Sequence, residues 1–211
     1  VMLMVDVSGS GDFGTHIAIK RDVVTEIAAT LAFSAIQNND KIGVIFFSDK
    51  IEKFIPPKKG KKHILYIIRE LLTFEPESKK TDIGMALKYL TNVLKKRCTT
   101  FLISDFIDSV DYKNALTIAN RKHDIVALQV YDILDAEIPD VGLMKILDAE
   151  TGNEQWIDTS ARKVRGHIRQ WWLQRQDKML DTFNRSRVDS VSIRTDEDYV
   201  KSLLLLFKKR S

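Results

Sequence analysis

The stretch Met4-Val5-Asp6-Val7-Ser8-Gly9-Ser10 decides how the chain is organised. An apolar run that begins at Val1 stops here at one carboxylate, two hydroxyls and a glycine. A short apolar run closed by Gly and Ser predicts a fully buried strand that leads into a loop. Asp6, Ser8 and Ser10 are therefore expected at the carboxyl end of a strand, where open α/β sheets bind their ligands.

The three polar side chains of this stretch all offer hard oxygen atoms, and none offers sulfur or imidazole. Such a set suits Mg²⁺ or Mn²⁺ and suits zinc poorly. A simpler interpretation is that Asp6 only holds the loop after the strand through hydrogen bonds. The metal prediction therefore depends on whether other oxygen ligands reach the same edge.

The length and composition indicate a single domain. The chain has 211 residues, of which 44% are hydrophobic and 29% charged, with a net charge of +4. A single cysteine, Cys98, excludes an intramolecular disulfide and a cysteine-based metal cluster. No apolar run is long enough to span a bilayer. Because the chain opens inside a strand, we expect a cytoplasmic fragment of a longer protein, whose other parts could be attached to a membrane.

Strand-like and helix-like segments alternate along the chain. Strands are expected at 42–47, 51–55, 98–104, 125–130, 143–148, 155–158 and 188–193, and helices at 18–37, 64–72, 82–96, 111–121, 160–185 and from Asp196 onward. Pro56 and Pro57 are expected to end the second arm of the first hairpin, an edge strand. This alternation predicts a doubly wound, mostly parallel sheet with helices on both faces and an antiparallel edge strand.

An acidic loop is expected after the 125–130 strand. Thr159 or Ser160 is expected to cap the long helix that ends near 185. Asp196 is expected to cap the last helix, whose inward-facing residues should be Val200, Leu203, Leu204 and Phe207.

Two further segments bring oxygen groups toward the first loop. Thr81 stands at the front of the 82–96 helix, and Ser104-Asp105 follows a buried strand. Thr81 or Asp82 can cap the helix, or the Thr81 hydroxyl can serve a cation. In a sheet of order 3-2-1-4-5-6 the first and fourth strands are neighbours, so Asp6 and Asp105 are expected to flank one crevice.

These five positions resemble the metal-ion-dependent adhesion site of von Willebrand factor type A domains, a likeness that covers about residues 1–135. The resemblance implies a Rossmann-like fold and a bound Mg²⁺ or Mn²⁺. It implies that Ser8 and Ser10 bind the cation directly and Thr81 directly or through water. Asp6 and Asp105 would act through water or as hydrogen-bond acceptors. One position would stay open for an Asp or Glu of a partner protein.

The remainder of the chain resembles a narrower group. Residues 131–142 (Y-D-I-L-D-A-E-I-P-D-V-G), the turn 148–152 (D-A-E-T-G) and 195–199 (T-D-E-D-Y) are similar to conserved bacterial proteins of unknown function, commonly encoded beside MoxR-type AAA+ ATPases. The resemblance implies one domain over 1–211, with a common core to about 135 and a family-specific part over 136–211. Whether Asp132 and Asp135 join the site or cap the loop stays open.

Two alternatives compete with a protein-interaction module. For a metal-assisted hydrolase or phosphotransferase, Asp6 could be the nucleophile, but Ser8 stands where a second aspartate is expected. The four histidines are scattered and are expected at the surface or in loops. For nucleic-acid binding, the basic residues of 160–187 are interleaved with Gln and Asp, so we expect a solvated face with Trp171 or Trp172 packed inward. We therefore predict a non-enzymatic module with no nucleic-acid or membrane contact.

Overall fold

The structure of the chain, a computed structural model, describes residues 1–9, 17–147 and 154–210. Its elements alternate between strand and helix, as predicted. They are β1 (Met2–Asp6), α1 (Ile17–Gln37), β2 (Ile42–Phe47), β3 (Ile51–Lys58), α2 (Lys61–Thr73), α3 (Ile83–Val93), β4 (Thr99–Ser104), α4 (Lys113–Lys122), β5 (Asp124–Tyr131), α5 (Ile133–Ala136), β6 (Leu143–Leu147), β7 (Glu154–Asp158), α6 (Arg162–Ser186), β8 (Asp189–Arg194) and α7 (Tyr199–Arg210).

The central sheet has the strand order β3-β2-β1-β4-β5-β8, and every pair in it is parallel except β2 with β3. A separate antiparallel pair is formed by β6 and β7. The predicted fold class is confirmed, including the neighbouring first and fourth strands. The expected stop at Pro56 and Pro57 is wrong, because β3 continues through both to Lys58. An edge strand tolerates proline, since its outward N–H positions need no partner.

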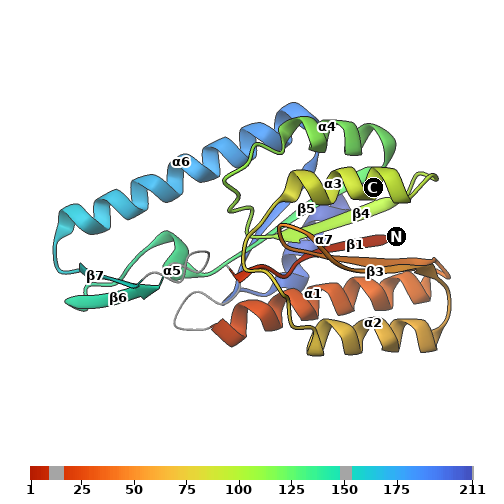
Figure 1. The fold of residues 1–211 in the computed structure, drawn as a ribbon, viewed down its shortest axis with the longest axis horizontal. Coiled ribbons are helices and arrows are strands. Elements are labelled where there is room, and N and C mark those ends of the chain that lie inside the picture. Colours follow the sequence, from red (N-terminus) through yellow and green to blue (C-terminus); the bar gives the residue numbers. More distant parts are fainter. Residues whose placement is uncertain (10–16, 148–153, 211) are drawn as a thin grey trace.

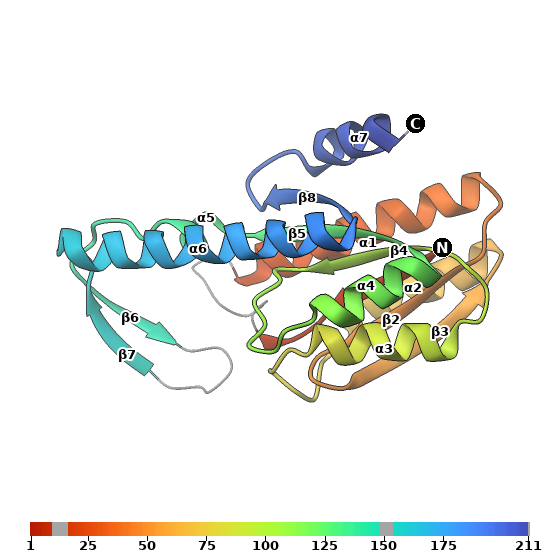
Figure 2. The ribbon, with the colours of Figure 1, turned by 90° about the horizontal axis from the view of Figure 1, so that it is seen from above.

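Both faces of the sheet are covered by helices (Figures 1 and 2). Leu3 and Val5 of β1 belong to the core cluster shared with α1, α2 and α7. Met2 and Met4 belong to the cluster shared with α3, α4 and α6. Successive side chains of a strand point to opposite faces, so a strand covered on both sides is apolar throughout. This explains the unbroken apolar run with which the chain begins.

The small β6–β7 sheet and the first turns of α6 extend away from the main body, whereas the end of α6 lies over it (Figure 1). The predicted caps of this helix are wrong, because Ala161 occupies the N-cap position without a side-chain bond. Thr159 instead donates to the carbonyl of Gly142 at 2.7 Å. Of the two tryptophans, Trp172 is buried and Trp171 is exposed.

The last two elements complete the sheet and its core. β8 pairs with β5, and Leu203 and Leu206 of α7 are buried. The prediction that Leu204 faces inward is wrong, since 63% of its surface is exposed. Asp196 pairs with Arg194 rather than capping α7. Within the described ranges, no helix combines the length and the apolarity that a membrane span requires.

Substitution of Phe183 tests whether the end of α6 is part of the core. Its ring is 1% exposed and meets the ring of Phe106 at 4.9 Å. We expect Phe183→Ala to lower the free energy of unfolding by about 3–5 kcal/mol, because it leaves a cavity under the helix. Leu173→Ala, on the same helix but 53% exposed, should change it by less than about 0.5 kcal/mol. Urea denaturation measures both, and equal losses would contradict this packing.

Candidate functional site

Four of the five predicted site residues lie at the carboxyl edge of the sheet, in the segments that follow β1 and β4 and precede α3. Val5 pairs with Ile103, so the last residues of β1 and β4, Asp6 and Ser104, lie side by side at this edge. Ser8, Thr81 and Asp105 are all buried. Ser10 lies outside the described residues. The parallel register therefore brings together two carboxylates and two hydroxyls that the sequence keeps far apart.

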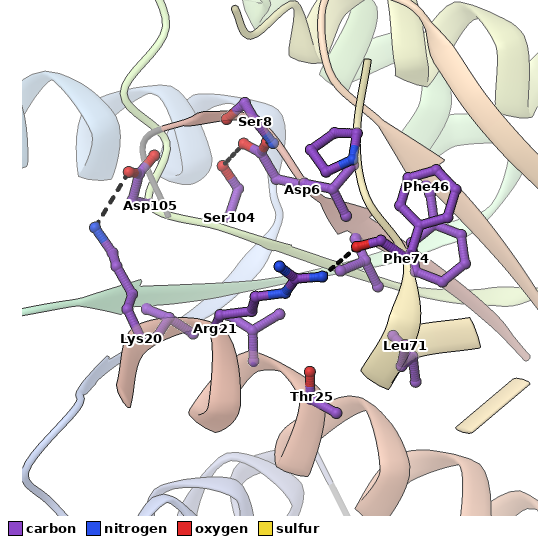
Figure 3. A pocket seen from close by; sticks show the side chains of 15 residues that line it. Asp6, Ser8, Lys20, Arg21, Thr25, Phe46, Leu71, Phe74, Ser104 and Asp105 are labelled. Carbon is purple, nitrogen blue, oxygen red and sulfur yellow. Dashed lines mark hydrogen bonds and ion pairs between the residues drawn. The ribbon is translucent and has the colours of Figure 1, made fainter. Parts of the chain in front are cut away.

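The carboxylate of Asp6 is held by two donors (Figure 3 shows it beside Ser104). Its Oδ1 accepts the N–H of Ser8 at 3.0 Å, and its Oδ2 accepts the hydroxyl of Ser104 at 2.6 Å. Burial raises the pKa of Asp6 to about 6, the negative charge of Asp105 adds to the rise, and the two donors oppose it. Asp6 is thus an oriented carboxylate next to a second one.

Thr81 points into the site and does not cap α3. Its hydroxyl donates to Oγ of Ser8 at 2.8 Å, a contact between residues 73 positions apart. The N-cap of α3 is Asp82, whose side chain accepts the N–H of Met85 at 2.7 Å. Of the two predicted roles, capping therefore falls to Asp82, and the Thr81 hydroxyl lies against the first loop.

Backbone bonds fix the segment that carries Thr81. The N–H of Gly9 donates to the carbonyl of Lys79 at 2.9 Å, and that of Asp82 donates to the carbonyl of Ser48 at 3.1 Å. The carboxylate of Glu52 accepts the Ser48 hydroxyl at 2.7 Å. These bonds tie the loops after β1 and β2 to the start of α3, so the position of Thr81 follows from the sheet.

Asp105 is oriented by its own loop and by a lysine. Its Oδ1 accepts the N–H of Ile107 at 3.0 Å, and its Oδ2 lies 3.3 Å from Nζ of Lys20. Phe106, which lies between Asp105 and Ile107 in the chain, has a backbone φ of 57°, which is unusual for a bulky residue. Its N–H donates to Oγ of Ser104 at 2.9 Å and its ring is buried, so hydrogen bonding and packing together hold this strained turn.

Lys20 connects the site to the segment after β5. Its Nζ also lies 3.0 Å from Oδ2 of Asp135. Although burial lowers the pKa of Lys20, the carboxylates of Asp105 and Asp135 outweigh it, so the net shift is upward. The expected acidic loop contains the short helix α5, whose capping box is formed by Asp132 and Asp135. Both aspartates are therefore caps, and Asp135 additionally reaches the site through Lys20.

The residues present fit a hard divalent cation. Their donors are carboxylate and hydroxyl oxygens, the ligands that Mg²⁺ and Mn²⁺ prefer. Asp105 and Asp135 pair with the single ammonium of Lys20, and Asp6 lies beside Asp105. Over the described residues no group of three or more His, Cys, Asp or Glu side chains could hold a metal ion, so a cation here would depend on the hydroxyls.

An apolar pocket opens beside the carboxylates (Figure 3). It is lined by Val24 of α1, Phe46 of β2 and Leu71 of α2, with Asp6 and Lys20 on its polar side. The candidate site therefore combines buried charge with an adjoining apolar surface.

The DUF58 family, described as protein of unknown function, matches the chain over residues 1–178. The chain belongs to the DUF58 family. It is 28% identical over 212 residues to uncharacterized proteins of Mycobacterium tuberculosis and Mycobacterium bovis, which covers 99% of this chain and 66% of each relative. The chain thus spans slightly less than two thirds of the length of these curated relatives.

Among solved structures, this DUF58 chain is similar to the conserved hypothetical protein BatB from Bacteroides thetaiotaomicron, with a TM-score of 0.59 and 16% identity over 99% of this chain and 96% of that one. It is also similar to a von Willebrand factor type A protein from Catenulispora acidiphila, with a TM-score of 0.50 and 11% identity over 62% of this chain and 32% of that one. These likenesses establish the fold, which is von Willebrand factor A-like.

Two histidines of this DUF58 chain lie at the other edge of the sheet. His63 bonds to the carbonyl of Ile42 at the start of β2, and His123 directly precedes β5. His123 lies in the connection between α4 and β5, as expected of a loop histidine, but it is fully buried and contacts Cys98. Neither can act on the carboxylates described above.

Sequence reasoning missed the roles of Ser104 and Lys20. Ser104 is adjacent to Asp105, so its position at the end of a buried strand was a usable signal. Lys20 lies three and four positions before Val23 and Val24, on the apolar stripe of α1. A lysine on a buried stripe indicates a buried acidic partner, because an uncompensated charge there is costly.

Ser104→Ala tests how strongly the site is held together. It removes the donor to the Asp6 carboxylate and the acceptor of the Phe106 N–H, so we expect a loss of about 1–3 kcal/mol in the free energy of unfolding. Thr73→Ala is the control, because its exposed hydroxyl donates to the carbonyl of Arg69 within α2. The control should lose less than about 1 kcal/mol in the same denaturation experiment. A smaller loss for Ser104→Ala than for the control would contradict the assignment.

Proposed function

We propose that this DUF58 chain is a protein-interaction module that binds Mg²⁺ or Mn²⁺ through Asp6, Ser8, Ser10, Thr81 and Asp105. The observation that supports this most is the 2.8 Å contact between the hydroxyls of Thr81 and Ser8, both buried and next to the oriented carboxylate of Asp6. Ser10 enters the proposal on its place in the sequence pattern.

Each side chain has a distinct role in this proposal. The hydroxyls of Ser8, Ser10 and Thr81 supply neutral oxygen ligands. The carboxylates of Asp6 and Asp105 supply the negative charge that offsets the cation. The cation, once bound, attracts a carboxylate of a partner protein as a further ligand, a compact and strongly charge-assisted contact.

We propose a MoxR-type AAA+ ATPase as the partner, on the likeness of residues 131–142, 148–152 and 195–199 described above. The von Willebrand factor A-like fold is compatible with an interaction module, although a fold alone does not assign a function. The charges on α6 argue against nucleic-acid binding as its role. Arg165 pairs with Asp140 at 3.0 Å and Arg185 with Asp181 at 2.8 Å, so part of the basic charge is already compensated.

The metal site is tested by titrating the chain with Mg²⁺ and Mn²⁺ in a calorimeter. We expect one saturable site, and at least about tenfold weaker binding by Asp6→Ala, which removes a buried negative charge. Asp49→Ala is the matched control, because Asp49 is exposed in the turn between β2 and β3 and should leave the affinity unchanged. Absence of binding by the intact, folded chain would remove the metal from the mechanism.

The partner is tested with a purified MoxR-type ATPase from the same organism. Binding that disappears in EDTA, returns with Mg²⁺ and is lost in Asp6→Ala is the expected result. Binding that persists both in EDTA and in Asp6→Ala would contradict the role of the cation. DNA binding by the chain with a steep dependence on salt would instead favour a nucleic-acid role for α6.

A further inference from the structure

The ammonium group of Lys20 is buried inside the candidate cation site. Only 4% of the residue is exposed, and Nζ lies 3.3 Å from Oδ2 of Asp105 and 3.0 Å from Oδ2 of Asp135. Figure 3 shows the lysine reaching from the first turns of α1 to the Asp105 carboxylate. A divalent cation that binds the Asp105 carboxylate would therefore lie close to a fixed positive charge.

The ammonium of Lys20 is paired with carboxylates from two separate elements. Asp105 comes from the loop after β4 and Asp135 from α5, and Asp6 lies on the far side of Asp105 at the end of β1. Two carboxylates therefore face the ammonium, and a third lies beyond Asp105. The excess of negative charge favours a divalent cation, and the ammonium opposes it through like-charge repulsion at short range.

We propose that Lys20 is a positioning residue that weakens divalent-cation binding, because it occupies one oxygen of Asp105 and places a positive charge beside the cation. Asp135 has the opposite effect, since its carboxylate draws the ammonium away from Asp105 and offsets its charge. This inference rests on the proposed function. It predicts that the cation affinity of the module is set by α1 and α5 as well as by the ligand residues.

The test compares two substitutions that break the same ion pair but change the charge in opposite directions. Lys20→Met removes the positive charge and keeps a long unbranched side chain, so we expect Mg²⁺ and Mn²⁺ to bind about tenfold more tightly. Asp135→Asn removes a negative charge and should weaken binding by a similar factor. Lys20→Arg keeps the charge and should restore the affinity of the unmodified chain.

Both Lys20→Met and Asp135→Asn should be less stable than the unmodified chain without metal. The first leaves two buried carboxylates without their shared ammonium, and the second leaves the ammonium with Asp105 alone. Added Mg²⁺ should raise the melting temperature of Lys20→Met more than that of the unmodified chain. Calorimetric titration and thermal denaturation with Mg²⁺ alone provide the two readouts.

Parallel losses of affinity in both substitutions would overturn the inference, since a merely structural ion pair moves both in the same direction. Equal affinities of the unmodified chain, Lys20→Met and Asp135→Asn would also overturn the inference, while leaving the metal site in place. If neither the unmodified chain nor Lys20→Met binds Mg²⁺ or Mn²⁺, the proposed metal site falls as well. If Lys20→Met does not fold, the Mg²⁺ affinity of Asp135→Asn decides. Weaker binding than that of the unmodified chain is expected, and equal or tighter binding would contradict the inference.

Discussion

The parallel pairing of β1 with β4 places the carboxylates of Asp6 and Asp105 at one buried edge of the sheet. Two like charges in a poorly solvated crevice repel each other, and each also loses hydration. The surroundings compensate for this. The N–H of Ser8 and the hydroxyl of Ser104 donate to Asp6, while the N–H of Ile107 and the ammonium of Lys20 donate to Asp105. Much of the hydrogen bonding at this edge of the sheet compensates for the proximity of these two carboxylates.

The loop that carries Asp105 is also a packing element. Phe106 adopts a left-handed backbone conformation and places its ring against Phe183 of α6 at 4.9 Å. The strained turn is held because the hydroxyl of Ser104 accepts its N–H and the ring is buried. The end of α6 and the Asp105 loop therefore share one contact, which joins the C-terminal part of the chain to the candidate site.

Fold and function separate clearly in this molecule. A von Willebrand factor A-like sheet provides a crevice at the carboxyl ends of its strands, and such a crevice can serve different chemistries. The crevice of this chain contains two buried hydroxyls in contact, two neighbouring carboxylates, and a lysine that links Asp105 to the capping box of α5.

The sequence by itself determined the order of the elements and the main sheet. Unbroken apolar runs such as residues 1–5 require burial on both faces, and the strand order follows from the alternation with helices. It also predicted the edge at which Asp6, Ser8, Thr81 and Asp105 meet. Local signals failed where tertiary contacts decide: β3 continues through two prolines because it is an edge, and Thr159 bonds to Gly142 instead of capping α6.

Only the tertiary structure decided the partners of the buried charges. Lys20 lies 85 positions from Asp105 and 115 from Asp135, and no local pattern links them. The same holds for the bond from Ser104 to Asp6, which spans 98 positions. Periodicity reports which face of an element is buried, because that depends on neighbours along the chain. Which groups meet across the crevice depends on strand register and helix placement, and these are set by the packing of the whole core.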